Sequence, residues 1–270
     1  GNDKVRVDLR VISSTNKDLD AAIDAFAADP TQANLDAARQ AWLDSREPYL
    51  QTEVYRFYGG PIDDEDGPEG LLNAWPLDEA YIDYVEGNAD AGIIQDTSVE
   101  ISATSLESLN EQGGEENIAT GYHAIEFLLW GQDMNPAGPG DRAYTDYVEG
   151  EDNAANPDRR TLYLTTTSDL LVTHLESVES EWAEGGDNYR ASFVSESPED
   201  GLRKVLTGMI ILSGFETGGE RLQTALEQII RNHIRLRMLS KKQIAVVTGL
   251  HKLDKAVGHR TVFDVVHRVN

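Results

Sequence analysis

Apolar residues recur along most of the chain at the 3.6-residue spacing of an α-helix. The clearest stripe follows Thr31, a candidate N-cap, and consists of Leu35, Ala38, Ala41, Trp42 and Ser45. Pro48 is expected to kink or restart this helix, because proline lacks the backbone N–H that a helix interior uses. A further helical stretch then runs over residues 49–57 towards a glycine-proline break at residues 59–61.

The remaining pattern predicts helices near residues 78–86, 97–111, 115–131 and 160–183. Ser197 and Pro198 form a strong start signal for a last helix that reaches Leu222. This helix contains Gly214, Gly218 and Gly219, each costing about 1 kcal/mol relative to alanine. We expect these glycines to allow the close approach of another helix or a ligand.

The predicted organisation is all-α, with three parts. Residues 1–145 form an N-terminal helical bundle, 146–230 a C-terminal helical half, and 231–270 a basic tail. The polar, acidic segment 146–160 is expected to be the main linker.

Charge narrows the choice of partners. The net charge is −25, divided into +7 over residues 231–270 and −32 over the rest. Nucleic acid and anionic lipid are therefore poor candidate partners for the bulk of the surface and cations are better ones, but an acidic, well-solvated surface explains the charge more simply than specific attraction of cations. Cysteine is absent, so any metal must be held by histidine, carboxylate, tyrosine or water. No apolar run is long enough to cross a bilayer and no signal peptide is visible, so membrane attachment would require a lipid anchor that this chain does not show.

The candidate chemistry lies in a Gly-x-His-x-x-Glu motif at the start of an apolar run, residues 121–131. The spacing of three places His123 and Glu126 on one helical face, where they can form half of a metal site or simply a hydrogen bond. Glu216 and Glu220, four residues apart, form a second candidate pair.

Several segments together resemble the imelysin family, which includes iron-regulated proteins. They are AARQAWLDSREPYLQTEVYRFYGGPID, NAWPLDEAYIDY, GYHAIEFLLWGQD, YRASF and GMIILSGFETGGERL, in the family's order. The resemblance covers residues 20–228 and is expected to stop after Glu227, where the basic tail replaces an acidic family segment rich in His and Asp.

The resemblance implies an all-α fold of two helical-bundle halves, a periplasmic or lipid-anchored place in the bacterial envelope, and a role in iron acquisition. The implied ligand is a metal ion or small iron-containing compound, with iron first and zinc or copper as alternatives, and an envelope iron-uptake protein is an implied partner. Carried over by motif, the metal ligands are His123, Glu126, Glu53 and Glu220, with Arg56, Glu216 and Arg221 in support.

Two alternatives stay open. The family's peptidase activity would make the chain a metallopeptidase, but the zincin pattern needs a second histidine at residue 127, which is Phe127, and no Gly-x-Ser-x-Gly motif occurs. Alternatively, a structural His-Glu-Arg cluster would lock the halves of a non-catalytic interaction module together. The four tryptophans, Trp42, Trp75, Trp130 and Trp182, are expected to be core residues.

Overall fold

The computed structural model of the chain describes residues 9–135, 138–150, 153–223 and 225–226. The chain divides into two units, Gly1–Met209 and Ile210–Asn270, each of which is described here by itself. The predicted basic tail, residues 231–270, lies outside the described residues. The domain boundaries at residues 146 and 231 stay predictions.

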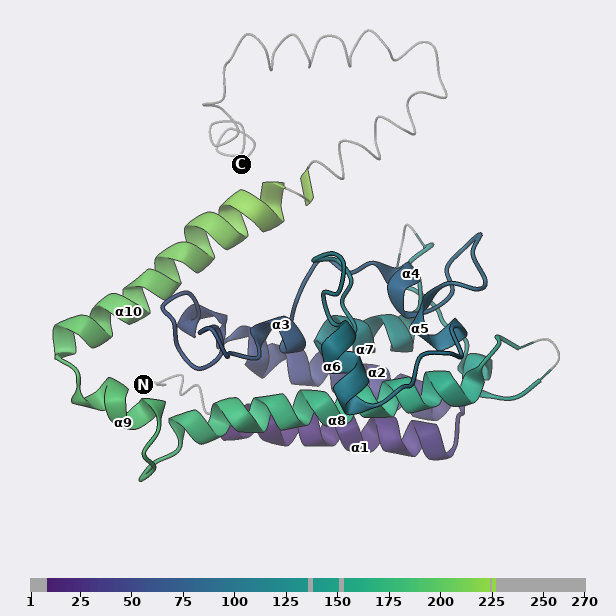
Figure 1. Cartoon of the computed structure of the whole chain (residues 1–270), viewed down its shortest axis with the longest axis horizontal. Helices are drawn as coiled ribbons and strands as arrows, with labels where there is room; N and C mark the ends of the chain where they lie inside the picture. The colour runs from purple at the N-terminus through teal and green to yellow at the C-terminus, as the bar shows by residue number, and fades with distance from the viewer. Residues whose placement is uncertain (1–8, 136–137, 151–152, 224, 227–270) are drawn as a thin grey trace, which may run out of the picture. The chain divides into compact units, whose positions relative to one another are not determined.

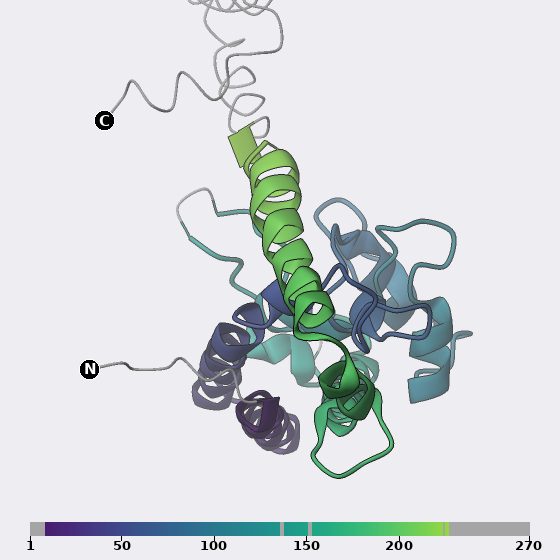
Figure 2. The ribbon, with the colours of Figure 1, turned by 90° about the vertical axis from the view of Figure 1, so that its left-hand side faces the viewer.

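Three long helices carry the first unit. Helix α1 (Leu9–Ala28) packs along both α2 (Gln32–Leu50) and α8 (Pro157–Trp182), as Figure 1 shows for α1 and α8. Seen from the side in Figure 2, α1 and α2 lie next to each other. Helix α7 (Gly121–Trp130) packs against α2 and α8, and the side chains between these helices form one apolar core.

Short helices and turns fill the long connections between these four helices. They are η1 (Glu53–Tyr55), α3 (Glu69–Leu72), α4 (Glu79–Ile82), α5 (Gly92–Gln95), α6 (Ala103–Leu109) and η2 (Tyr144–Tyr147). After α8 the first unit continues with α9 (Tyr189–Ser195) and α10 (Pro198–Ile210), whose last residue already belongs to the second unit.

Helix ends follow the predicted capping residues. The Thr31 hydroxyl accepts a hydrogen bond from the Asn34 N–H at the start of α2, and the Ser197 hydroxyl accepts one from the Asp200 N–H at the start of α10. The predicted restart at Pro48 is wrong, since α2 continues past it to Leu50 and residues 53–55 form only a 3₁₀ turn. Pro48 cannot donate to the carbonyl four residues before it, but it lies two residues from the end of α2, so this loss affects only the last turn.

The glycine-rich part of the last predicted helix has a different geometry. Residues Ile211–Arg221 of the second unit form a π-helix rather than a continuation of α10. Among the described atoms, a Cβ built at Gly214 would meet nothing within 4 Å, and one at Gly218 or Gly219 would meet only backbone oxygens of the same segment. Within the described part of the second unit no other segment lies against these glycines, and the expected approach of another helix or a ligand stays a prediction.

The all-α prediction is confirmed. Within the described ranges the only β-type pairing is an isolated bridge between Val85 and Asn88. None of the helices described has both the length and the apolar composition that crossing a bilayer requires.

Candidate functional site

Helix α7 is buried on all but one narrow face. Of its ten residues, seven are buried, and the three that reach the surface are His123, Glu126 and Trp130. Their spacing of three and four residues places them one above another on one side of the helix. An otherwise apolar helix thus presents one polar and aromatic stripe, which contains both residues of the Gly-x-His-x-x-Glu motif.

Gly121, the glycine of the motif, allows α7 to begin in close contact with α3. Gly121 has φ +82°, and a Cβ built there would lie 2.5 Å from the carbonyl oxygen of Leu72. Only glycine combines a left-handed backbone with so close an approach. The Thr120 hydroxyl donates to the neighbouring Leu71 carbonyl at 3.0 Å, so α3 fixes the first turn of α7 and, with it, His123.

The exposed stripe of α7 faces a cavity of about 410 Å³. This volume lies within the range of small-molecule sites. The cavity is lined by Trp42, Leu43, Trp75, Leu77, Glu79, His123, Glu126, Phe127, Trp130, Gly131, Asp133, Pro139 and Gly140. Its walls are therefore largely aromatic and apolar, and its ionisable groups are one imidazole and three carboxylates.

Tryptophans form the walls in two different ways. Trp42 is 7% exposed, donates through Nε1 to the Tyr122 carbonyl at 2.9 Å, and meets Trp130 edge to face at 5.4 Å. Trp75 is 67% exposed, and its ring lies 4.8 Å from the His123 ring. The prediction that every tryptophan is a core residue is wrong for Trp75, which is mostly exposed and contacts the His123 imidazole at the cavity instead of packing in the core.

His123 and Glu126 are brought together as predicted. The Nδ1 atom of His123 lies 2.9 Å from Glu126 Oε2. A carboxylate acceptor at Nδ1 favours the tautomer in which Nδ1 carries the proton, which leaves the Nε2 lone pair available to a ligand. Within the described part of the chain, no third His, Asp or Glu completes a group that could hold a metal ion.

Two further acids line the cavity. Burial raises the pKa of the Glu79 carboxyl, a hydrogen bond from Gln132 opposes this, and the charge of Asp133 adds to it. Asp133 Oδ1 accepts a hydrogen bond from the Asn135 N–H at 3.0 Å. Sequence reasoning did not select either residue because both lie outside the Gly-x-His-x-x-Glu motif, although Glu79 and Asp133 both lie in segments that carry the family resemblance.

Glu53 and Arg56 lie in a neighbouring polar cluster and are not among the lining residues of the cavity. Arg56 Nη1 is 2.8 Å from Glu69 Oε1. Burial raises the pKa of the Glu69 carboxyl, and the charge of Arg56 opposes this rise. Glu53 is 4% exposed, and its Oε1 lies 3.5 Å from Nδ2 of Asn73. Asn73 precedes Trp75 by two residues, so this cluster anchors the segment that carries Trp75.

Glu216, Glu220 and Arg221 all lie in the π-helix of the second unit. Because the two units are described separately, the ligand set that combines Glu220 with His123 stays a prediction.

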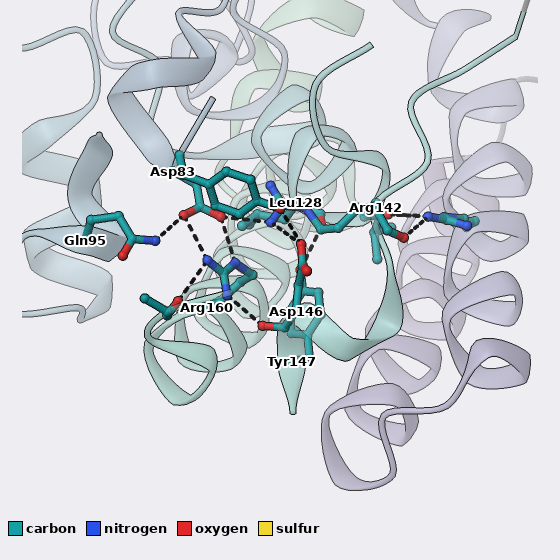
Figure 3. Close-up of polar contacts among 11 residues, drawn as sticks. Asp83, Gln95, Leu128, Arg142, Asp146, Tyr147 and Arg160 are labelled. Carbon is teal, nitrogen blue, oxygen red and sulfur yellow. Dashed lines mark hydrogen bonds and ion pairs between the residues drawn. The ribbon is translucent and has the colours of Figure 1, made fainter. Parts of the chain in front are cut away.

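A buried ionic network, missed by sequence reasoning, lies behind the cavity (Figure 3). Asp83 receives two hydrogen bonds from Arg160, Nε to Oδ2 at 2.7 Å and Nη2 to Oδ1 at 3.0 Å. Arg142 Nη1 bridges Asp83 Oδ2 at 2.9 Å and Asp146 Oδ2 at 3.2 Å. Burial alone would raise the pKa of Asp83, but the hydrogen bond from Arg160 and the two guanidinium charges lower it below 3.8.

This network buries both ends of the segment 146–160, which was expected to be a polar linker. Asp146 and Arg160 are 8% and 0% exposed, because their charges are paired in the interior. The network also supports the cavity wall, since the Arg142 N–H donates to the Trp130 carbonyl at 2.8 Å and the Arg142 carbonyl accepts from Arg39 Nη2 at 2.8 Å. The C-terminal end of α7 is thereby held in place.

Comparison with known proteins agrees with the motifs. The sequence model of the imelysin family matches residues 9–251, so the similarity continues beyond the point after Glu227 where it was expected to stop. A curated relative, Iron-regulated protein A of Synechococcus elongatus, is 45% identical over 112 residues. That match covers 42% of this chain and 24% of the relative, so the chain matches about a quarter of the relative's length.

Proposed function

Because this chain belongs to the imelysin family, we propose that it binds a metal ion or a small iron-containing compound in the cavity beside α7. The observation that carries the proposal is the His123–Glu126 pair at the cavity. Glu126 engages Nδ1 at 2.9 Å, and the remaining nitrogen of His123 is a ligand atom for iron, zinc or copper. A carboxylate behind a metal-binding histidine is the usual means of fixing its orientation.

A metal compound fits the site better than a bare ion. His123 and Glu126 supply only two donor groups, and the described residues add no third at ligand distance. A cavity of about 410 Å³ with tryptophan walls leaves room for a metal that carries organic ligands of its own. His123 would then occupy one open coordination position, and the aromatic walls would cover the organic part.

The proposed biological setting is the bacterial envelope, with iron uptake as the process and an envelope protein as the partner. Support comes from the family and from the name of the relative, Iron-regulated protein A. The metallopeptidase alternative needs three protein ligands and a bound water, whereas the described site offers two donors. The interaction-module alternative would link Arg56 to the motif, but the ion pair that Arg56 makes is with Glu69.

The test is metal content by mass spectrometry after loading the full chain with Fe(II), Fe(III), Zn(II) or Cu(II), each supplied both as the free ion and as a complex with a tetradentate organic ligand that leaves a coordination position open to His123. The four histidines of residues 231–270, His233, His251, His259 and His267, are replaced by glutamine in every protein so that they cannot bind metal. We expect about one equivalent in this parent and none in His123→Ala. The matched control is His174→Ala, a histidine of α8 that lies 3.1 Å from Glu107, which should bind like the parent.

Variants of Glu126 test whether this residue binds the metal itself or orients His123. If Glu126 orients His123, Glu126→Ala should weaken affinity about 10- to 100-fold, and Glu126→Gln, which keeps an acceptor oxygen, should weaken it less. Equal metal content in the parent and in His123→Ala, with helicity by circular dichroism unchanged, would refute the site.

A further inference from the structure

We infer that the cavity selects a metal compound of net positive charge, with an aromatic or apolar organic shell. The inference rests on the proposed function and adds the chemical class of the ligand. It excludes anionic polycarboxylate chelates of iron.

The charge of the cavity carries the first step. Glu79, Glu126 and Asp133 line it, and neither lysine nor arginine is among the lining residues. The side chain of Glu126 is 42% exposed, so its second oxygen can face a ligand while Oε2 holds His123. An anionic complex would meet three carboxylates at short range, whereas a cationic one would be attracted by them.

Three arginines lie beside aromatic residues of the lining without lining the cavity themselves. Arg46 lies 5.6 Å from the Trp42 ring centre and donates to Asn73 Oδ1 at 2.7 Å. The Arg39 guanidinium lies 5.8 Å from the Trp130 ring centre and donates to the carbonyls of Leu129 and Arg142. Arg142 itself is 5% exposed and paired with Asp83 and Asp146. Arg39 also pairs with Asp36 at 3.4 Å, so the three guanidinium groups are engaged outside the lining and offer no anchor for an anionic ligand.

The aromatic walls of the cavity also favour a cationic ligand. The faces of tryptophan rings carry negative electrostatic potential and attract cations, and Trp42, Trp75 and Trp130 all line the cavity. Flat aromatic ligands around a metal can also stack on Trp75, whose ring is mostly exposed. Carboxylates and indoles together therefore favour a cationic complex with aromatic ligands.

The experiment compares two Fe(II) complexes by calorimetry without oxygen. Tris(2-pyridylmethyl)amine gives a doubly positive complex and nitrilotriacetate a singly negative one. Both ligands are tripodal and tetradentate, and both leave a coordination position open to His123. We expect the full chain to bind the cationic complex at least about tenfold more tightly.

Two variants separate charge from ring stacking. Glu79→Gln/Asp133→Asn removes both accessory charges but keeps oxygen acceptors for Gln132 and Asn135, and should weaken the cationic complex about tenfold while improving the anionic one. Asp18→Asn/Glu100→Gln makes the same charge change at two exposed positions that do not line the cavity, and should alter neither affinity.

The outcomes distinguish the two proposals. Equal or tighter binding of the anionic complex, lost in His123→Ala, would overturn the charge inference and leave the metal site standing. An unchanged preference in Glu79→Gln/Asp133→Asn would also overturn it, because ring stacking would then explain the selectivity. Binding of neither complex would overturn the inference, whereas the proposed function is decided separately by the metal content of the parent and of His123→Ala.

Discussion

Trp75 and Trp42 line the same cavity but are held by different forces. Trp42 is 7% exposed, packs in the apolar core and satisfies its N–H through the Tyr122 carbonyl. Trp75 is 67% exposed and contacts the His123 ring at a centroid distance of 4.8 Å. The first tryptophan therefore stabilises the fold, whereas the second contributes mainly to the cavity surface.

This difference predicts opposite effects of alanine substitution. Trp75→Ala should leave the free energy of unfolding within about 0.5 kcal/mol of wild type. It should weaken the cationic iron complex by about threefold to tenfold, the range of one aromatic contact. Trp42→Ala should lower the free energy of unfolding by about 3–5 kcal/mol, because it removes a large buried side chain. Urea denaturation and calorimetry measure the two quantities; equal destabilisation by both substitutions would contradict this division.

At the scale of the element, α7 shows what a sequence pattern can and cannot predict. The spacing of His123 and Glu126 predicted their shared face, and the apolar run predicted burial of the rest of the helix. The other half of the cavity comes from Glu79 and Trp75, more than forty residues away, and no periodicity links segments at that separation.

Helix α10 shows a second limit of the pattern. Leu202, Leu206, Met209 and Ile210 have the spacing of an apolar stripe, yet in the structure they are 44–67% exposed. Periodicity predicts that a helix has an apolar face and does not identify what covers that face.

The start of α7 yields a prediction with a built-in control. Gly121 and Gly185 both have φ +82°, but a Cβ at Gly121 would lie 2.5 Å from Leu72 O, whereas one at Gly185 would meet nothing within 4 Å. Gly185→Ala should cost only the left-handed backbone strain, about 1–2 kcal/mol. Gly121→Ala should cost about 1–3 kcal/mol more through overpacking, and should weaken metal binding because His123 shifts with the helix start. Urea denaturation of both variants checks this; equal losses would mean that the contact with α3 relaxes freely.

At the scale of the first unit, the network of Asp83, Arg142, Asp146 and Arg160 joins segments from α4 to α8. In the sequence these residues are scattered in polar stretches, and charge in such stretches ordinarily indicates solvent exposure. Burial was unpredictable because it depends on three partners meeting in space. Each buried ion is stabilised only while the others remain. Removal of any one member would leave a buried charge unpaired and would destabilise the unit.

The network also gives the unit a defined response to acid. Because the pKa of folded Asp83 is lowered below 3.8, the folded state binds fewer protons than the unfolded state near that pH. The stabilisation is therefore complete above the unfolded value and is lost as pH falls through the folded value. The raised pKa values of Glu69 and Glu79 act with the opposite sign, since their folded forms take up protons more readily, but they are common to wild type and variants.

Substitution of Asp83 tests its contribution to the pH dependence of stability. At pH 7, Asp83→Asn should lower the free energy of unfolding by about 3–5 kcal/mol, because Arg142 and Arg160 lose a buried counter-charge. Below about pH 4 its stability should fall less steeply than that of wild type, so that the two urea midpoints converge. Asp18→Asn, an exposed change on α1, should follow the wild-type curve throughout. Parallel curves for wild type and Asp83→Asn would show that this carboxylate does not couple folding to pH, and coincident curves would show that the neutral amide satisfies the two arginines equally well.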